Sequence, residues 1–135
     1  MTAIEVYIQQ LVSNIKKDSF FSTTRFLREY TEKKIESPLV DFLVVTALKS
    51  EKEKRSFLGG KLQQNARIAF SIYAPPEKGG RGLLEMSLRL KEAIRKADTE
   101  NLVTSTEISP TEFNQNIKAI TRKVYADLLY CDEGE

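Results

Sequence analysis

The stretch LVDFLVVTAL, residues 39–48, carries apolar or β-branched side chains on both of its alternating faces. Even-numbered positions from Val40 to Leu48 form one face, and odd-numbered positions from Leu43 to Ala47 form the other. A strand with this pattern is typically central in a sheet and covered on both sides. We therefore predict that this stretch is the core strand and that the other elements pack around it.

The chain returns toward this strand over residues 65–74, where Ile68 and Phe70 share one face. Residues 39–74 are therefore predicted to form a β-hairpin with a long tip. The tip is basic, because residues 49–67 carry six basic and two acidic side chains, a net charge of +4. A solvated loop explains such a run, and so does a surface that meets phosphate or an acidic partner.

Elements on either side of the hairpin complete the pattern. Apolar residues at helical spacing predict one helix over residues 2–17 and another over residues 82–98. The remaining segments are predicted as strands at 21–32, 102–108 and 117–130, with turns at 33–38 and 109–114. The order α-β-β-β-α-β-β predicts an α+β fold class with a largely antiparallel β-sheet, on which the N-terminal helix and the second helix pack.

Residue types that carry most catalytic chemistry are scarce in this chain. It has no histidine and a single cysteine, Cys131. The side chains that usually form metal clusters, catalytic triads or an activated thiol are therefore largely missing from the sequence. Gly79, Gly80 and Gly82 precede the second predicted helix, but their spacing matches neither common phosphate-binding pattern. We expect a protein that is not an enzyme and that binds no cofactor or metal.

The composition and the length of the apolar stretches indicate whether the chain could contain a membrane-spanning helix. Charged residues make up 30% of the chain and hydrophobic residues 41%, and no apolar stretch reaches the roughly 20 residues that a membrane helix needs. The first ten residues lack the long apolar core of a signal peptide. We therefore expect a globular protein without a membrane-spanning helix that remains inside the cell in which it is made.

Three short motifs and the order of the elements resemble a known protein family. The motifs are Phe57-Leu58-Gly59-Gly60, the strand segment at residues 68–75, and Pro76-Glu77-Lys78-Gly79-Gly80 before the second helix. Their combination is similar to the small tail-terminator (tail-completion) proteins of bacteriophages and prophages of Gram-positive bacteria. The resemblance implies a single α+β domain over residues 1–135 with a structural role and no reaction to catalyse.

The resemblance also implies partners and locations. Copies of the chain, monomeric in isolation, are expected to assemble into a homo-oligomeric ring such as a hexamer. This ring is expected to cap the tail tube protein and join it to the head-tail connector protein, with nonspecific contact to DNA in its lumen. The expected locations are the host cytoplasm during assembly and the virion tail afterwards.

The candidate interface implied by the resemblance combines the basic tip with the loop at residues 77–82. Phe57 and Leu58 are expected to anchor a neighbouring subunit or the tube, although packing onto their own sheet explains them equally well. The loop is expected to become ordered on assembly, and the acidic C-terminus offers a partner for the tip. The candidate interface residues are Lys52, Lys54, Arg55, Phe57, Leu58, Lys61, Glu77, Lys78 and Arg81.

Two other functional classes remain as hypotheses. A small nonspecific nucleic-acid-binding module is supported by the +4 segment and by a sequence pI near 8.6. An enzyme that uses paired carboxylates, such as Glu51 with Glu53, requires a protected cleft that shifts their pKa values. Salt-dependent binding of mixed-sequence DNA by the isolated chain would distinguish the first of these from a structural subunit.

Overall fold

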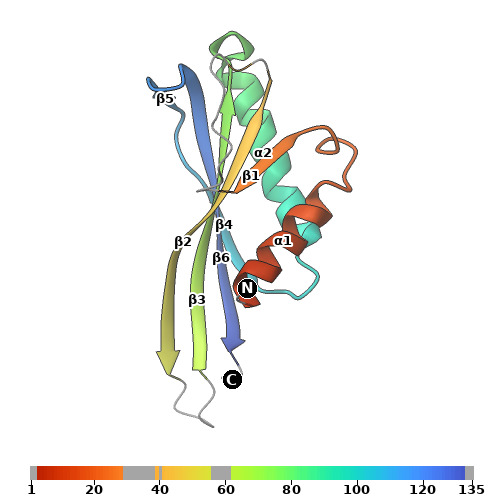
Figure 1. Ribbon diagram of the computed structural model, residues 1–135, viewed down its shortest axis with the longest axis vertical. Coiled ribbons are helices and arrows are strands. Elements are labelled where there is room, and N and C mark those ends of the chain that lie inside the picture. The colour runs from red at the N-terminus through yellow and green to blue at the C-terminus, as the bar shows by residue number, and fades with distance from the viewer. Residues whose placement is uncertain (1–2, 29–38, 40, 56–61, 133–135) are drawn as a thin grey trace.

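The computed structural model describes residues 3–28, 39, 41–55 and 62–132 (Figure 1). Within these residues two α-helices, a short 3₁₀ helix and a six-stranded, mostly antiparallel sheet confirm the predicted α+β fold class. In chain order the elements are α1 (Ala3–Ile15), β1 (Arg25–Arg28), β2 (Leu43–Arg55), β3 (Leu62–Ala74), η1 (Pro76–Lys78), α2 (Gly79–Ala97), β4 (Val103–Ile108), β5 (Glu112–Asn114) and β6 (Ala119–Asp132).

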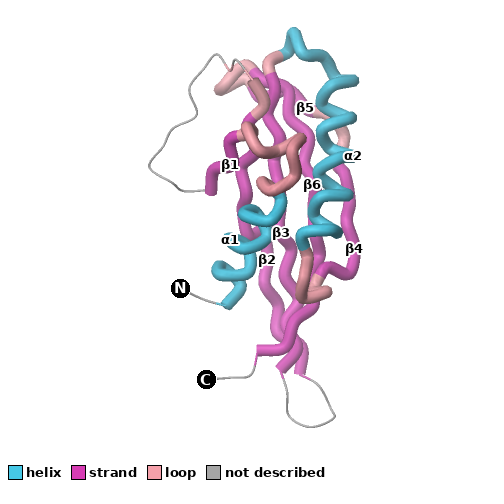
Figure 2. Tube along the Cα trace, turned by 90° about the vertical axis from the view of Figure 1, so that its right-hand side faces the viewer, coloured by secondary structure: helices cyan, strands magenta, loops and turns pink. Residues whose placement is uncertain are grey.

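The strands follow the order β1-β2-β3-β6-β4, and β5 pairs with β6 next to β4. Neighbouring strands are antiparallel except for β1, which runs parallel to β2 and pairs with Leu43–Thr46. Both helices cover one face of the sheet (Figure 2). The far ends of β2, β3 and β6 continue past the helices as a three-stranded arm, residues 52–55, 62–65 and 129–132 (Figure 1).

The core lies between the helices and the covered face of the sheet. Leu11 of α1, Phe70 of β3 and Leu90 of α2 are all at most 1% exposed and belong to one cluster of apolar side chains. Full burial of one side chain of this size contributes about 1.5–3 kcal/mol. The apolar spacing that predicted both helices is therefore the spacing of residues that face this core.

The solvated-loop interpretation of residues 49–55 is wrong, because this segment is the second half of β2. After an irregularity between Leu48 and Ser50, pairing with β3 continues from Ser50 opposite Arg67 to Arg55 opposite Leu62. Strand pairing uses main-chain groups, so alternating charged side chains do not prevent it, and lysine is common on strands at sheet edges. Charge patterning was therefore a poor guide to backbone structure here.

The predicted loop at residues 77–82 is also wrong, because Pro76–Lys78 form η1 and α2 begins at Gly79. The fixed φ of Pro76 suits the first position of a helical turn. Gly79 has a φ of 73°, a value that glycine adopts without the steric cost other residues incur. These two residue types, which indicated a break in the sequence, instead join two helical segments.

Several strands differ from prediction, and the one predicted at 39–48 begins only at Leu43. Within the described residues, the strand predicted at 21–32 is limited to Arg25–Arg28, because the preceding residues form hydrogen-bonded turns such as Phe21 N–H to the Asp18 carbonyl (3.0 Å). The predicted turn at 109–114 contains β5, whose pairing with β6 no local pattern indicated. The predicted turn at 33–38 lies outside the described residues.

A buried carboxylate ties both helices to the sheet. Asp98, which follows α2 and is 9% exposed, accepts a hydrogen bond from the Tyr7 hydroxyl on α1 (2.7 Å). Its two oxygens also accept the main-chain N–H groups of Leu102 (3.1 Å) and Val103 (2.9 Å), where β4 begins. One side chain therefore joins α1, the end of α2 and the start of β4.

This arrangement makes stability sensitive to alkaline pH. Burial, then the hydrogen bond to Asp98 and the negative charges of Asp98 and Glu100, raise the pKa of Tyr7 well above its ordinary value of about 10. The folded state thus keeps a proton that the unfolded state releases, so the contribution of Tyr7 is complete below about pH 10 and declines above it. Between about pH 9 and pH 11, we expect the wild type to lose more stability in urea unfolding than Tyr7→Phe, by up to about 1.4 kcal/mol per pH unit above pH 10. Equal losses in the two proteins would contradict this explanation.

Candidate interaction surface

The predicted interface residues do not form one surface. Lys52, Lys54 and Arg55 lie on the arm, whereas Glu77 and Lys78 lie in η1 and the exposed Arg81 in the first turn of α2. Strand β3 begins opposite Arg55 and ends shortly before η1, and its 13 residues place the two groups about 40 Å apart. Phe57, Leu58 and Lys61 lie outside the described residues.

Along one edge of the sheet, the described strands leave most of β2 unpaired. Strand β1 pairs with β2 only as far as Thr46, so among the described strands none pairs with the outer edge of β2 from Ala47 to Arg55. This stretch includes Lys49, Lys52, Lys54 and Arg55 against two acidic residues, and β1 adds Arg25 and Arg28. The described residues of this edge are therefore mainly basic, and no described strand pairs with the outer main-chain groups of β2 beyond Thr46.

The opposite edge has the opposite charge. Strands β4 and β5 both pair with β6 on one side only, and no described strand pairs with their other side. The two strands themselves carry Glu107 and Glu112 and no lysine or arginine, although Glu107 also forms an ion pair with Arg67 of β3. A chain with one basic and one acidic open edge is suited to head-to-tail association, in which two different surfaces meet.

An apolar groove lies beside the open part of β2, between α1 and the end of β1. It has a volume of about 290 Å³ and is lined mainly by Val12, Phe26 and Leu27, with Lys16 and Arg28 also contributing to its wall. Thr46 also lines the groove, and its buried hydroxyl has no hydrogen-bond partner. The buried hydroxyls of Thr106 and Thr121 have no partner either, so this feature does not set the groove apart.

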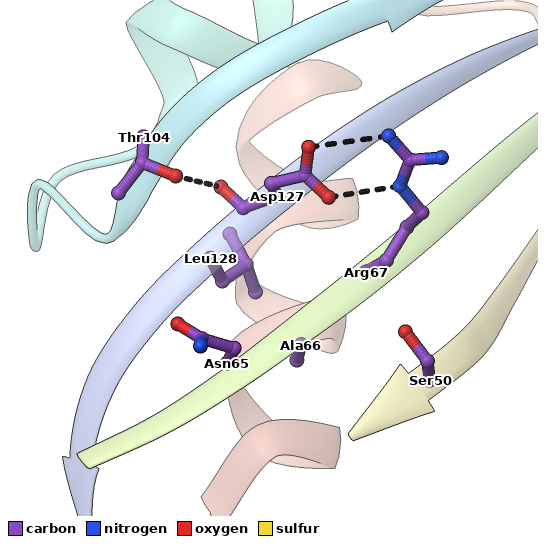
Figure 3. Close-up of a pocket in the computed structure, with 7 residues that line it drawn as sticks. All are labelled: Ser50, Asn65, Ala66, Arg67, Thr104, Asp127 and Leu128. Atoms are coloured by element: carbon purple, nitrogen blue, oxygen red, sulfur yellow. Dashed lines mark hydrogen bonds and ion pairs between the residues drawn. The ribbon is translucent and has the colours of Figure 1, made fainter. Parts of the chain in front are cut away.

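A second cavity, of about 310 Å³, lies around Arg67 (Figure 3). Arg67 reaches Asp127 through Nε (2.8 Å) and Nη2 (3.3 Å) and forms an ion pair with Glu107 (2.9 Å). Asp127 also accepts a hydrogen bond from the Ser105 hydroxyl (2.9 Å), and Arg67 lies 4.6 Å from the centre of the Tyr125 ring. The contacts join β3, β6 and β4.

These contacts also set the ionisation of the pair. The hydrogen bond from Arg67 holds the pKa of Asp127 below its usual range, and the same bond raises the pKa of Arg67. Both side chains are about one-third exposed, so the pair adds little to stability. Because each charged side chain of this cluster already has a partner within the chain, we assign this cavity a structural role and no ligand.

Side chains that could hold a metal ion are not clustered in the described part of the chain. No group of three or more cysteine, aspartate or glutamate side chains there is placed to hold a metal ion. None of the described helices is long and apolar enough to cross a membrane. The distinctive features are instead two sheet edges of opposite charge and the apolar groove.

Fold and surfaces together define the class: an α+β protein with an open-edged sheet covered by helices on one face. Comparison with known families and proteins adds no closer assignment, because no family model and no curated protein matches the sequence.

Proposed function

We propose that this protein is a structural subunit of a bacteriophage or prophage tail, which assembles into a ring that caps the tail tube and joins it to the head connector. The sequence resemblance to tail-terminator proteins supports the proposal. The structural observation that carries it is the opposite charge of the two open sheet edges. Head-to-tail contacts between such edges generate a closed ring when the rotation between neighbours closes.

The arm supplies the surface for the tail partners. It extends past both helices (Figure 1), and its β2 strand carries Lys52, Lys54 and Arg55. On the arm, the Tyr130 hydroxyl contacts carboxylate and amide oxygens of Glu51 and Gln64, which links the outer strands through β3. A braced, basic projection of this kind fits an acidic protein surface or DNA that passes through the ring.

The proposal is tested with the purified protein and tail tubes from a phage or prophage of the source host. We expect electron microscopy to show density capping one end of each tube, and Lys54→Glu with Arg55→Glu to reduce the capped fraction at least about tenfold. The matched control reverses two exposed charges away from the arm, Lys17→Glu just after α1 with Lys96→Glu on α2, and should cap tubes normally.

Two results would reject this function. Tubes that stay uncapped at every protein concentration would remove the proposed role. Binding of mixed-sequence DNA by the monomer, with affinity that falls steeply as salt rises, would favour the nucleic-acid-binding module instead.

A further inference from the structure

We propose that Phe113 of one copy inserts into the groove beside β1 of the next copy, while its β4–β5 edge lies along the open part of β2. This inference rests on the proposed function, because it names the contact between neighbouring subunits of the ring. It assigns the groove an aromatic side chain from a second copy as its ligand. Glu112, which precedes Phe113, would then lie near the basic edge.

Phe113 is suited to act as an anchor. It is 56% exposed, more than the other exposed large apolar side chains of the described chain. It lies on β5 opposite Ile120, and directly opposed residues of neighbouring strands point to the same face of a sheet. Since Ile120 packs against the core under the helices, Phe113 projects from the helix side at the acidic edge.

The groove lies on the same face of the sheet at the other edge. Thr46 is opposite the core residue Phe70, and Phe26 is opposite the core residue Val44. A neighbour that continues the sheet with its helices on the same side therefore brings Phe113 to the side on which the groove opens. Val12, Phe26 and Leu27 offer apolar contact to the incoming ring.

Charge and strand direction agree with this pairing. Glu112, next to Phe113, is exposed, and Lys16 and Arg28 lie in the groove wall. Antiparallel steps lead from β2 to β3, from β3 to β6 and from β6 to β5, so β5 runs opposite to β2. Continuation of the sheet into the next copy preserves that direction and gives an antiparallel pair, which is slightly more stable per residue than a parallel one.

The test compares self-association of Phe113→Ala with that of the wild type by sedimentation over a range of concentrations, alone and with tail tubes. We expect at least about 30-fold weaker association, the effect of losing about 2 kcal/mol at a buried aromatic anchor. Phe20→Ala is the matched control, because Phe20 is 38% exposed but lies against Arg89 of α2. It should associate normally.

A second variant blocks the groove without removing a core side chain. Ser13 is exposed on α1 and lines the groove, so Ser13→Trp should fill it and weaken association as Phe113→Ala does. The two variants have complementary defects: Phe113→Ala keeps a normal groove, and Ser13→Trp keeps a normal Phe113. In an equimolar mixture one copy of each can therefore form a single contact. We therefore expect the mixture to form dimers and no larger assemblies.

The outcomes separate this contact from the proposed function. Rings that form and cap tubes normally in both variants would overturn the contact and leave the function supported. Association that depends on Phe113 without any capping of tubes would support the contact and reject the function. A wild-type protein that stays monomeric at every concentration, with and without tubes, would overturn both.

Discussion

Replacement of Asp98 by alanine is expected to lower the free energy of unfolding by about 3–5 kcal/mol, measured by urea denaturation at neutral pH. The carboxylate accepts hydrogen bonds from the Tyr7 hydroxyl and from the N–H groups of Leu102 and Val103. Its removal leaves these donors with no acceptor in a site that is 9% exposed. An unsatisfied buried donor costs about 1–3 kcal/mol, and the loss of several exceeds the typical effect of a surface substitution.

Two controls separate the network from a general effect of losing an aspartate. Asp18 is exposed and accepts one hydrogen bond, from the Phe20 N–H at 2.9 Å, so Asp18→Ala should cost less than about 1 kcal/mol. Tyr7→Phe removes one donor and leaves both main-chain bonds, so its cost should lie between those of the two alanine variants. An Asp98→Ala protein as stable as Asp18→Ala would contradict the proposed linkage of three elements.

Sequence patterns correctly predicted the elements whose conformation follows from the spacing of their own apolar residues. Leu83, Met86, Leu90 and Ile94 recur at helical spacing because they face one core, and the structure buries all four. Apolar residues on both faces of 39–48 correctly predicted a strand of the hairpin, but that strand begins at Leu43 and the helices cover only one face of the sheet. The charged half of β2 was misjudged, because its strand conformation comes from main-chain pairing with β3, to which its side-chain pattern gives no clue.

The candidate site was harder to predict because distant segments build it. The groove depends on the parallel pairing of β1 with β2, which no spacing rule indicated, and on α1 from a third part of the chain. The Arg67 cluster joins residues 40 and 60 positions apart. Phe113 was placed in a turn, since a three-residue strand is too short to show alternation, and its exposure depends on the edge it occupies.

The same substitution at two phenylalanines should separate folding from assembly. Phe70 is 0% exposed at the centre of β3, between Thr46 of β2 and Val124 of β6, so Phe70→Ala leaves a cavity that the neighbouring strands cannot close. We expect it to lower the free energy of unfolding by about 3–5 kcal/mol in urea denaturation. Phe113→Ala removes an exposed ring and should change that free energy by about 0.5 kcal/mol or less.

The contrast between these variants distinguishes internal packing from a surface reserved for a partner. Phe70→Leu, which keeps most of the apolar volume, should recover the greater part of the lost stability, since the cost of such changes follows the cavity left behind. Phe113→Leu should likewise retain much of the association, because the groove beside β1 selects for apolar volume. If Phe113→Ala destabilised the monomer as strongly as Phe70→Ala, Phe113 would be part of the chain's own core and the contact between copies would require another anchor.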